Sequence, residues 1–203
     1  MAGQEKKEKH TKLSKVILAS SSEVRKIMLN QYFTEVINVP HNVEEEKYKK
    51  QKKNPEEIVL RIAKEKALSV LEDYPNETII ASDQILVCDN NLLSKPKSLE
   101  EATKKLLFLR NKTHKLHSST YVIQKGKLYF QQVKEASLFF ANISQNDIEL
   151  YVKNNKKTVL TTVGSYKIEK NSKYKFLNVI DGDLETILGF PIKDLIKKIK
   201  HEK

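Results

Sequence analysis

The chain has 203 residues, of which 39% are hydrophobic and 31% are charged; this composition suits a soluble one-domain protein and excludes a collagen, a coiled coil or a disordered chain. No apolar run reaches the roughly 18–20 residues of a membrane-spanning helix, the first fifteen residues lack the apolar stretch of a secretory signal, and Cys88 is the only cysteine. We therefore expect a cytoplasmic, reduced protein without a membrane contact.

The formal net charge of +11 makes a nucleic-acid-binding protein without catalytic activity an alternative. Only three of the 37 basic residues are Arg, the residue that best recognises bases and phosphates through paired hydrogen bonds. A compositional drift toward Lys, Asn and Ile explains the charge, and a small anionic substrate needs only a few positive charges in one place. We expect no stable nucleic-acid complex, and the sequence leaves the oligomeric state open, a homodimer included.

Residues 1–14 predict a flexible basic tail, and residues 15–203 predict a single domain. Short apolar runs predict strands at residues 16–19, 36–39, 78–81 and 85–87. Helical spacing of apolar residues predicts helices that begin near residues 23, 55, 99, 145 and 192, the second of them running to about residue 73.

The remaining segments lack helical periodicity. Residues 44–54 are almost all charged or polar and predict an exposed loop. Residues 115–140 predict a β-hairpin with Gly126 at its turn. Because strands and helices alternate, the sequence predicts an α/β fold with a β-hairpin insertion.

Four polar clusters interrupt the apolar segments. Residues 20–22, followed by Arg25, are either an anion site at a helix start or an ordinary helix cap with a surface Arg. Residues 44–46 are acidic, and residues 82–84 interrupt an apolar strand, where a carboxylate is costly unless the strand end faces a crevice. Residues 94–96 alone indicate only a turn. Together, these carboxylates and cations indicate phosphoryl or nucleotidyl chemistry with a divalent metal.

In this order, the motifs resemble the Maf family of nucleoside triphosphate pyrophosphatases. The matching segments are ILASSSEVRKIML (17–29), Val43-Glu44-Glu45, RIAKEKA (61–67), ASDQILV (81–87), Ser94-Lys95-Pro96, Thr113-His114, Gly164-Ser165-Tyr166 and GDLETILGFP (182–191). The resemblance spans about residues 15–200. It implies a mixed central sheet flanked by helices in two lobes around a nucleotide-binding cleft, similar to inosine triphosphatases.

The resemblance also implies an activity, the hydrolysis of a nucleoside triphosphate to the monophosphate and pyrophosphate with Mg²⁺ or Mn²⁺. It gives catalytic roles to Asp83, Glu45, Lys66 and Lys95. Within this set, Asp83 is the implied general base, and Asp83 and Glu45 are the implied metal ligands. Ser22 and Arg25 match residues that contact the phosphates.

Three further positions bear on the substrate. Gln84 and Glu169 match the branch of the family that acts on 7-methyl-GTP, whereas the dTTP/UTP branch has Thr and Gln there. A carboxylate accepts hydrogen bonds from guanine N1–H and its exocyclic amine, and it favours the cationic methylated base. Val24 stands where that branch often has Trp. The sequence therefore predicts a pyrophosphatase for 7-methyl-GTP or another modified nucleotide, with a dTTP/UTP pyrophosphatase as the alternative.

Overall fold

The computed structural model describes residues 13–51 and 54–202. Residues 1–12, most of the predicted basic tail, lie outside the described residues. Leu13 is buried, and its backbone forms a parallel bridge with Phe33, so the packed core extends to this residue. No helix among the described residues is long and apolar enough to cross a membrane.

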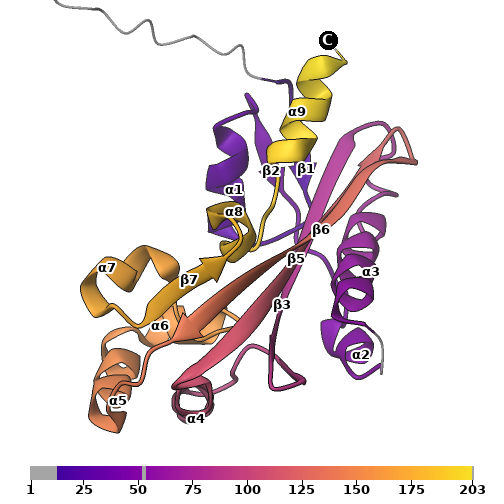
Figure 1. Cartoon of the computed structure of the whole chain (residues 1–203). Coiled ribbons are helices and arrows are strands. Elements are labelled where there is room, and N and C mark those ends of the chain that lie inside the picture. The colour runs from indigo at the N-terminus through magenta and orange to yellow at the C-terminus, as the bar shows by residue number, and fades with distance from the viewer. Residues whose placement is uncertain (1–12, 52–53, 203) are drawn as a thin grey trace, which may run out of the picture.

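A seven-stranded mixed sheet forms the centre of the molecule (Figure 1). Its strands are β1 (Val16–Leu18), β2 (Val36–Asn38), β3 (Thr78–Cys88), β4 (Asn91–Leu93), β5 (Lys112–Gln124), β6 (Lys127–Phe140) and β7 (Leu177–Asp181). The order is β2-β1-β3-β5-β6-β7, and β4 pairs with β3. The β1–β2 and β1–β3 pairs are parallel, and the others are antiparallel. Gly126, with φ +74°, lies in the predicted hairpin turn between β5 and β6.

The helices pack on both faces and at one end of this sheet. They are α1 (Glu23–Asn30), α2 (Glu45–Lys49), α3 (Pro55–Leu68), α4 (Leu99–Leu109), α5 (Gln145–Asn154), α6 (Lys156–Thr161), α7 (Asn171–Tyr174), α8 (Leu184–Ile187) and α9 (Lys193–His201). In Figure 1, α1, α8 and α9 lie on one side of the sheet, α2 and α3 on the other, and α4 to α7 around its lower end.

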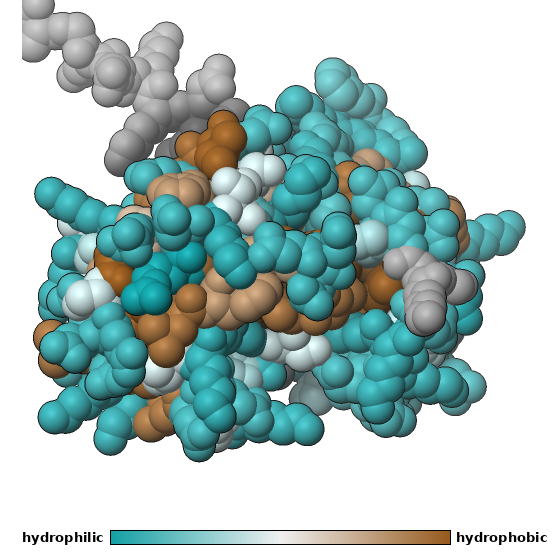
Figure 2. Space-filling view, turned by 60° about the horizontal axis from the view of Figure 1, so that its bottom comes forward, coloured by the Kyte–Doolittle hydropathy of each residue, from teal (hydrophilic) through white to brown (hydrophobic). Residues whose placement is uncertain are grey.

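The buried side chains divide the molecule into two lobes. Side chains of α1 and α9 pack on one face of the β1–β3 region, and those of α3 pack on the opposite face. A further core lies among α4, α5, α6 and the ends of β5 and β6. Figure 2 shows the end carrying α4 and α5, where hydrophobic residues reach the surface in a band between hydrophilic ones. The predicted α/β class with two lobes is confirmed.

Two predicted elements were wrong in their extent. Residues 44–54 do not form a loop throughout, because Glu45–Lys49 form α2. Lys49 donates to Glu45 and Glu46, each at 3.1 Å, and such i,i+4 and i,i+3 pairs stabilise a helix that lacks apolar periodicity. The helix predicted to reach residue 73 ends at Leu68. Strand β7 was not predicted, since four of its five residues are exposed and do not alternate in polarity.

The polar residues 82–84 do not interrupt a strand. Thr78–Cys88 form one continuous strand, so the prediction that Asp83 lies at a strand end was wrong. The sheet is instead open beside this position. Strand β1 pairs with β3 only as far as Ile80, and β4 pairs with it only from Leu86 onward. Because β5 occupies the other edge along this whole stretch, the edge of β3 between these two partners has no paired strand among the described residues.

Candidate active site

A buried lysine joins two carboxylates beside this opening. Lys66, on α3, places its Nζ 2.7 Å from Asp83 Oδ1 and 2.7 Å from Glu45 Oε1. The side chains of Lys66 and Asp83 are 3% and 5% exposed, and that of Glu45 is 23% exposed. One cation therefore lies between two carboxylates that are 38 positions apart in the chain, and only Glu45 faces solvent.

Each carboxylate has a second oxygen in a different environment. Asp83 Oδ2 is buried and has no hydrogen-bond partner among the described residues. Glu45 Oε2 accepts from Lys49 Nζ at 3.1 Å. Burial of Glu45 would raise its pKa, but Lys66 and Lys49 outweigh burial and lower it to about 2. Glu45 is therefore ionised at neutral pH, and Asp83 Oδ2 is the oxygen that remains available to accept a hydrogen bond.

Arg25 crosses the opening in the sheet. Its Nη1 donates to the carbonyl of Ser82 at 2.7 Å, and its Nε donates to the carbonyl of Gly189 at 3.2 Å. Burial lowers the pKa of Arg25, and the nearby Asp83 and Glu45 oppose that shift. The helix carrying Arg25 begins with Ser22, whose Oγ accepts from the Arg25 amide at 3.4 Å. In this structure Ser22 therefore caps the helix, and it lies one turn from the guanidinium.

Lys95 and His41 complete the charged cluster. Burial lowers the pKa of Lys95, and the nearby Arg25 and Lys66 lower it further while Glu45 opposes them. His41 Nε2 lies 3.9 Å from Glu45 Oε1, and burial also lowers the pKa of His41. His41 is not among the predicted site residues. Its position just after β2, the parallel neighbour of β1, is the signal that could have indicated it.

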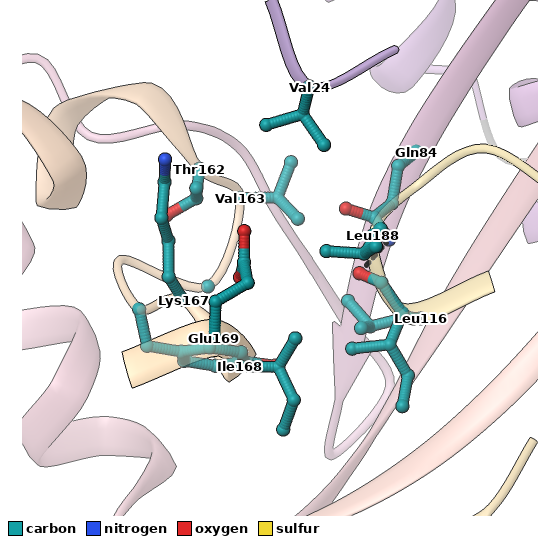
Figure 3. Close-up of a pocket in the computed structure, with 12 residues that line it drawn as sticks. Val24, Gln84, Leu116, Thr162, Val163, Lys167, Ile168, Glu169 and Leu188 are labelled. Carbon is teal, nitrogen blue, oxygen red and sulfur yellow. Dashed lines mark hydrogen bonds between the residues drawn. The ribbon is translucent and has the colours of Figure 1, made fainter. Parts of the chain in front are cut away.

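A pocket lies against the other face of β3 (Figure 3). It is lined by Val24, Gln84, Leu116, Thr162, Val163, Gly164, Tyr166, Lys167, Ile168, Glu169, Ile187 and Leu188. Asp83 and Gln84 are adjacent, and successive side chains of a strand point to opposite faces. The charged cluster and the pocket are therefore on opposite sides of one strand, at the place where the sheet is open.

The orientation of Gln84 is fixed by its amide nitrogen. Nε2 donates to Ser118 Oγ at 3.1 Å and to the carbonyls of Thr186 and Ile187, each at 3.0 Å. The amide oxygen consequently faces the pocket, and Figure 3 shows it there together with the Glu169 carboxylate. The pocket thus presents two oxygen acceptors, with the apolar Val24 above them.

Buried hydroxyl groups hold the segment around Gly189 against the sheet. Ser82 Oγ donates to the Gly189 carbonyl at 2.8 Å, and Ser118 Oγ donates to the Thr186 carbonyl at 2.8 Å. Gly189 has φ +81°, and a Cβ there would lie 3.1 Å from the Gln84 amide oxygen. The partners of these hydroxyls could not be predicted, because they lie 68 and 107 positions away in the chain.

The structure brings the nine predicted site residues into two groups. The first group is the charged cluster, which contains Arg25, Glu45, Lys66, Asp83 and Lys95. The second group lines the pocket and contains Val24, Gln84 and Glu169. The ninth residue, Ser22, caps the helix between them. Such a division suits a ligand with a polyanionic end and a planar polar end.

The chain is also similar in sequence to known proteins. A family model described as Maf-like protein matches residues 15–202. The chain belongs to the Maf family. Its relatives in the Maf family include the nucleoside triphosphate pyrophosphatase of Paramagnetospirillum magneticum, 33% identical over 89% of this chain and 94% of that protein. The predicted family and enzyme class, a hydrolase acting on acid anhydrides, are confirmed.

Two other Maf relatives differ in the substrate that their names give. The dTTP/UTP pyrophosphatase of Pyrococcus abyssi is 35% identical over 91% of this chain and 95% of that protein. The 7-methyl-GTP pyrophosphatase of Bartonella henselae is also 35% identical, over 73% of this chain and 75% of that protein. Sequence identity over the whole chain therefore does not separate the two substrates.

The fold is similar to that of the Staphylococcus aureus Ham1 protein. The TM-score is 0.51 at 16% sequence identity, and the match covers 93% of this chain and 100% of that chain.

Proposed function

We propose that this Maf-family nucleoside triphosphate pyrophosphatase hydrolyses 7-methyl-GTP to 7-methyl-GMP and pyrophosphate. The observation that carries the proposal is the pair of oxygen acceptors, from Gln84 and Glu169, that face one pocket. Guanine presents two neighbouring donors, N1–H and the exocyclic amine, to such acceptors, and N7-methylation adds a positive charge. Uracil and thymine present two carbonyls and one N–H, which two acceptors suit less well.

The charged cluster is suited to the triphosphate. Arg25, Lys66 and Lys95 supply three cationic groups beside the opening in the sheet, where they would stabilise the negative charge of the phosphates. Water would attack the α-phosphorus, and the bond to the bridging α–β oxygen would break, so pyrophosphate leaves. Asp83 Oδ2 is the buried acceptor that would take the proton from that water.

The donor set also fits a divalent cation. Asp83 and Glu45 offer carboxylate oxygens, and Mg²⁺ typically binds one or two carboxylates together with substrate phosphates. No cluster of three or more acidic, His or Cys side chains that could hold a metal occurs in the described part of the chain, so the nucleotide would complete the ligand set. The unpartnered Asp83 Oδ2 is the oxygen best placed as a ligand or base. When bound, such an ion neutralises phosphate charge.

A nucleotide panel tests the substrate and the metal together. Purified protein is incubated with 7-methyl-GTP, GTP, dTTP and UTP, and pyrophosphate is measured with Mg²⁺, with Mn²⁺ and with EDTA. We expect 7-methyl-GTP to have the highest kcat/KM, and EDTA to abolish turnover until either metal is restored. Turnover of dTTP and UTP far above 7-methyl-GTP would select the alternative substrate class.

Glu169→Gln tests which residue recognises the base. Glu169 is exposed, so we expect kcat/KM for 7-methyl-GTP to fall about tenfold, the size of one hydrogen bond to a charged group, while dTTP and UTP lose less or gain. The catalytic cluster is unchanged, so turnover should persist. Glu100→Gln, at an exposed position on α4, serves as the matched control. An unchanged ratio of kcat/KM values would show that Glu169 does not contact the base.

A further inference from the structure

Lys105 belongs neither to the charged cluster nor to the base pocket, but it connects a segment of one to a segment of the other. Lys105, on α4, donates to the carbonyl oxygen of Ser94 and, at 3.1 Å, to the carbonyl oxygen of Val163. Ser94 directly precedes Lys95, and Val163 lies between Thr162 and Gly164 in the lining of the pocket. One ammonium group therefore joins the segment that carries a cluster lysine to the wall of the pocket.

The surroundings of Lys105 are unusual for a lysine. The residue is half-buried and forms no ion pair among the described residues. Burial lowers its pKa to about 8; Glu101, on the same helix, opposes the shift, and Lys49, on α2, adds to it. Burying an ammonium without a carboxylate is unfavourable unless its hydrogen bonds are satisfied. Here two backbone carbonyls accept hydrogen bonds from the ammonium, and these two contacts fix the position of the side chain.

The contacts continue from the bridge into the charged cluster. Ser94 Oγ donates to the Glu46 carboxylate at 2.9 and 3.1 Å. Lys49 then joins Glu46 to Glu45, and Lys66 joins Glu45 to Asp83. An unbroken series of polar contacts thus runs from Asp83 to the wall of the pocket, and Lys105 is its last member.

We propose that Lys105 is a positioning residue of the reaction, which holds the Lys95 segment at a fixed place relative to the base pocket. The inference rests on the proposed function. A nucleotide bound at both ends fixes the distance between its base and its α-phosphorus. A misplacement of about 1 Å between binding and reacting groups costs an enzyme on the order of 10²-fold in rate, so a rigid link between the two walls has a direct effect on turnover.

Lys105→Met removes both hydrogen bonds while keeping a side chain of similar length. We expect kcat/KM to fall at least about tenfold, and the affinity for inorganic triphosphate, measured by calorimetry, to fall several-fold, because Lys95 is no longer held. Lys104→Met is the matched control, since Lys104 is exposed and its one ion pair among the described residues is with the exposed Glu100. Thermal unfolding establishes that each variant is folded, and Lys105→Gln, which keeps one donor, replaces the Met variant if it is not.

A double-mutant cycle separates positioning from general destabilisation. If Lys105 acts through Lys95, then Lys105→Met changes kcat/KM and triphosphate affinity by less than about twofold in a Lys95→Met background. The same loss in both backgrounds, or an unchanged triphosphate affinity in the single variant, would overturn the proposal. Triphosphate binding needs no chemistry, so a chain that hydrolyses no nucleotide would refute the proposed function while still giving a result for Lys105.

Discussion

Asp83→Asn is expected to lower kcat by about 10²–10⁴-fold, the usual contribution of a general base. The amide is nearly isosteric and keeps an oxygen for Lys66, which lies 2.7 Å from Oδ1, so the fold should persist. The atom at the Oδ2 position loses its ability to take a proton. Nucleotide affinity should fall much less, because the cations of the cluster are unchanged.

Pre-steady-state and steady-state rates of pyrophosphate release, together with nucleotide affinity, check this expectation. Asp89→Asn is the matched control; Asp89 follows the same strand, is exposed and pairs with Lys112 at 2.8 Å. If Asp83→Asn retains activity within a few-fold of the parent, Asp83 is only a partner for Lys66, and the proposed mechanism is wrong.

Lys66→Met should destabilise the fold by about 3–5 kcal/mol at neutral pH, the usual cost of leaving a buried charge unpaired. The substitution leaves Asp83 and Glu45 beside each other with no cation between them. Lys66 and Lys49 together lower the pKa of Glu45 to about 2, so the share of this stabilisation that Lys66 contributes is present above about pH 4.5 and is lost as the pH falls toward 2. The difference between the parent and the variant should therefore shrink in that range.

Urea unfolding at pH 7 and at pH 3 measures the two free energies. Lys64→Met, two residues earlier on the same helix, controls for the loss of a lysine from α3. A Lys66→Met variant as stable as the parent at pH 7 would show that the two carboxylates do not need the ammonium, and equal losses at both pH values would contradict the charge argument.

Local sequence patterns predicted most of the architecture because most elements carry their own signals. Val16–Leu18 and Val36–Asn38 lie in short apolar runs, and Ser22 and Ser98, residues that favour helix starts, cap the helices that follow them. The hairpin turn at Gly126 requires a positive φ, which glycine adopts without strain. These features depend on neighbours within a few positions, so the sequence displays them directly.

The errors concern residues whose partners are distant in the chain. Asp83 was expected at a strand end because a carboxylate within an apolar strand is costly, yet Lys66 from α3 offsets that cost. The bridge made by Lys105 could not be predicted either, since its acceptors are backbone carbonyls of Ser94 and Val163. A family resemblance indicated which charged residues belong together, whereas the opening in the sheet that separates them from the pocket is visible only in three dimensions.

The opening beside β3 has a consequence for solubility. An unpaired strand edge is a template for pairing with another chain, and proteins normally cover such edges or place charges on them. Here Arg25 does both, since its guanidinium binds the Ser82 carbonyl on that edge and carries a charge into the gap. The segment at Gly189 closes the other side of the guanidinium. Arg25, which we propose binds the phosphates, therefore also covers an unpaired backbone edge, and its replacement is expected to favour aggregation as well as to lower activity.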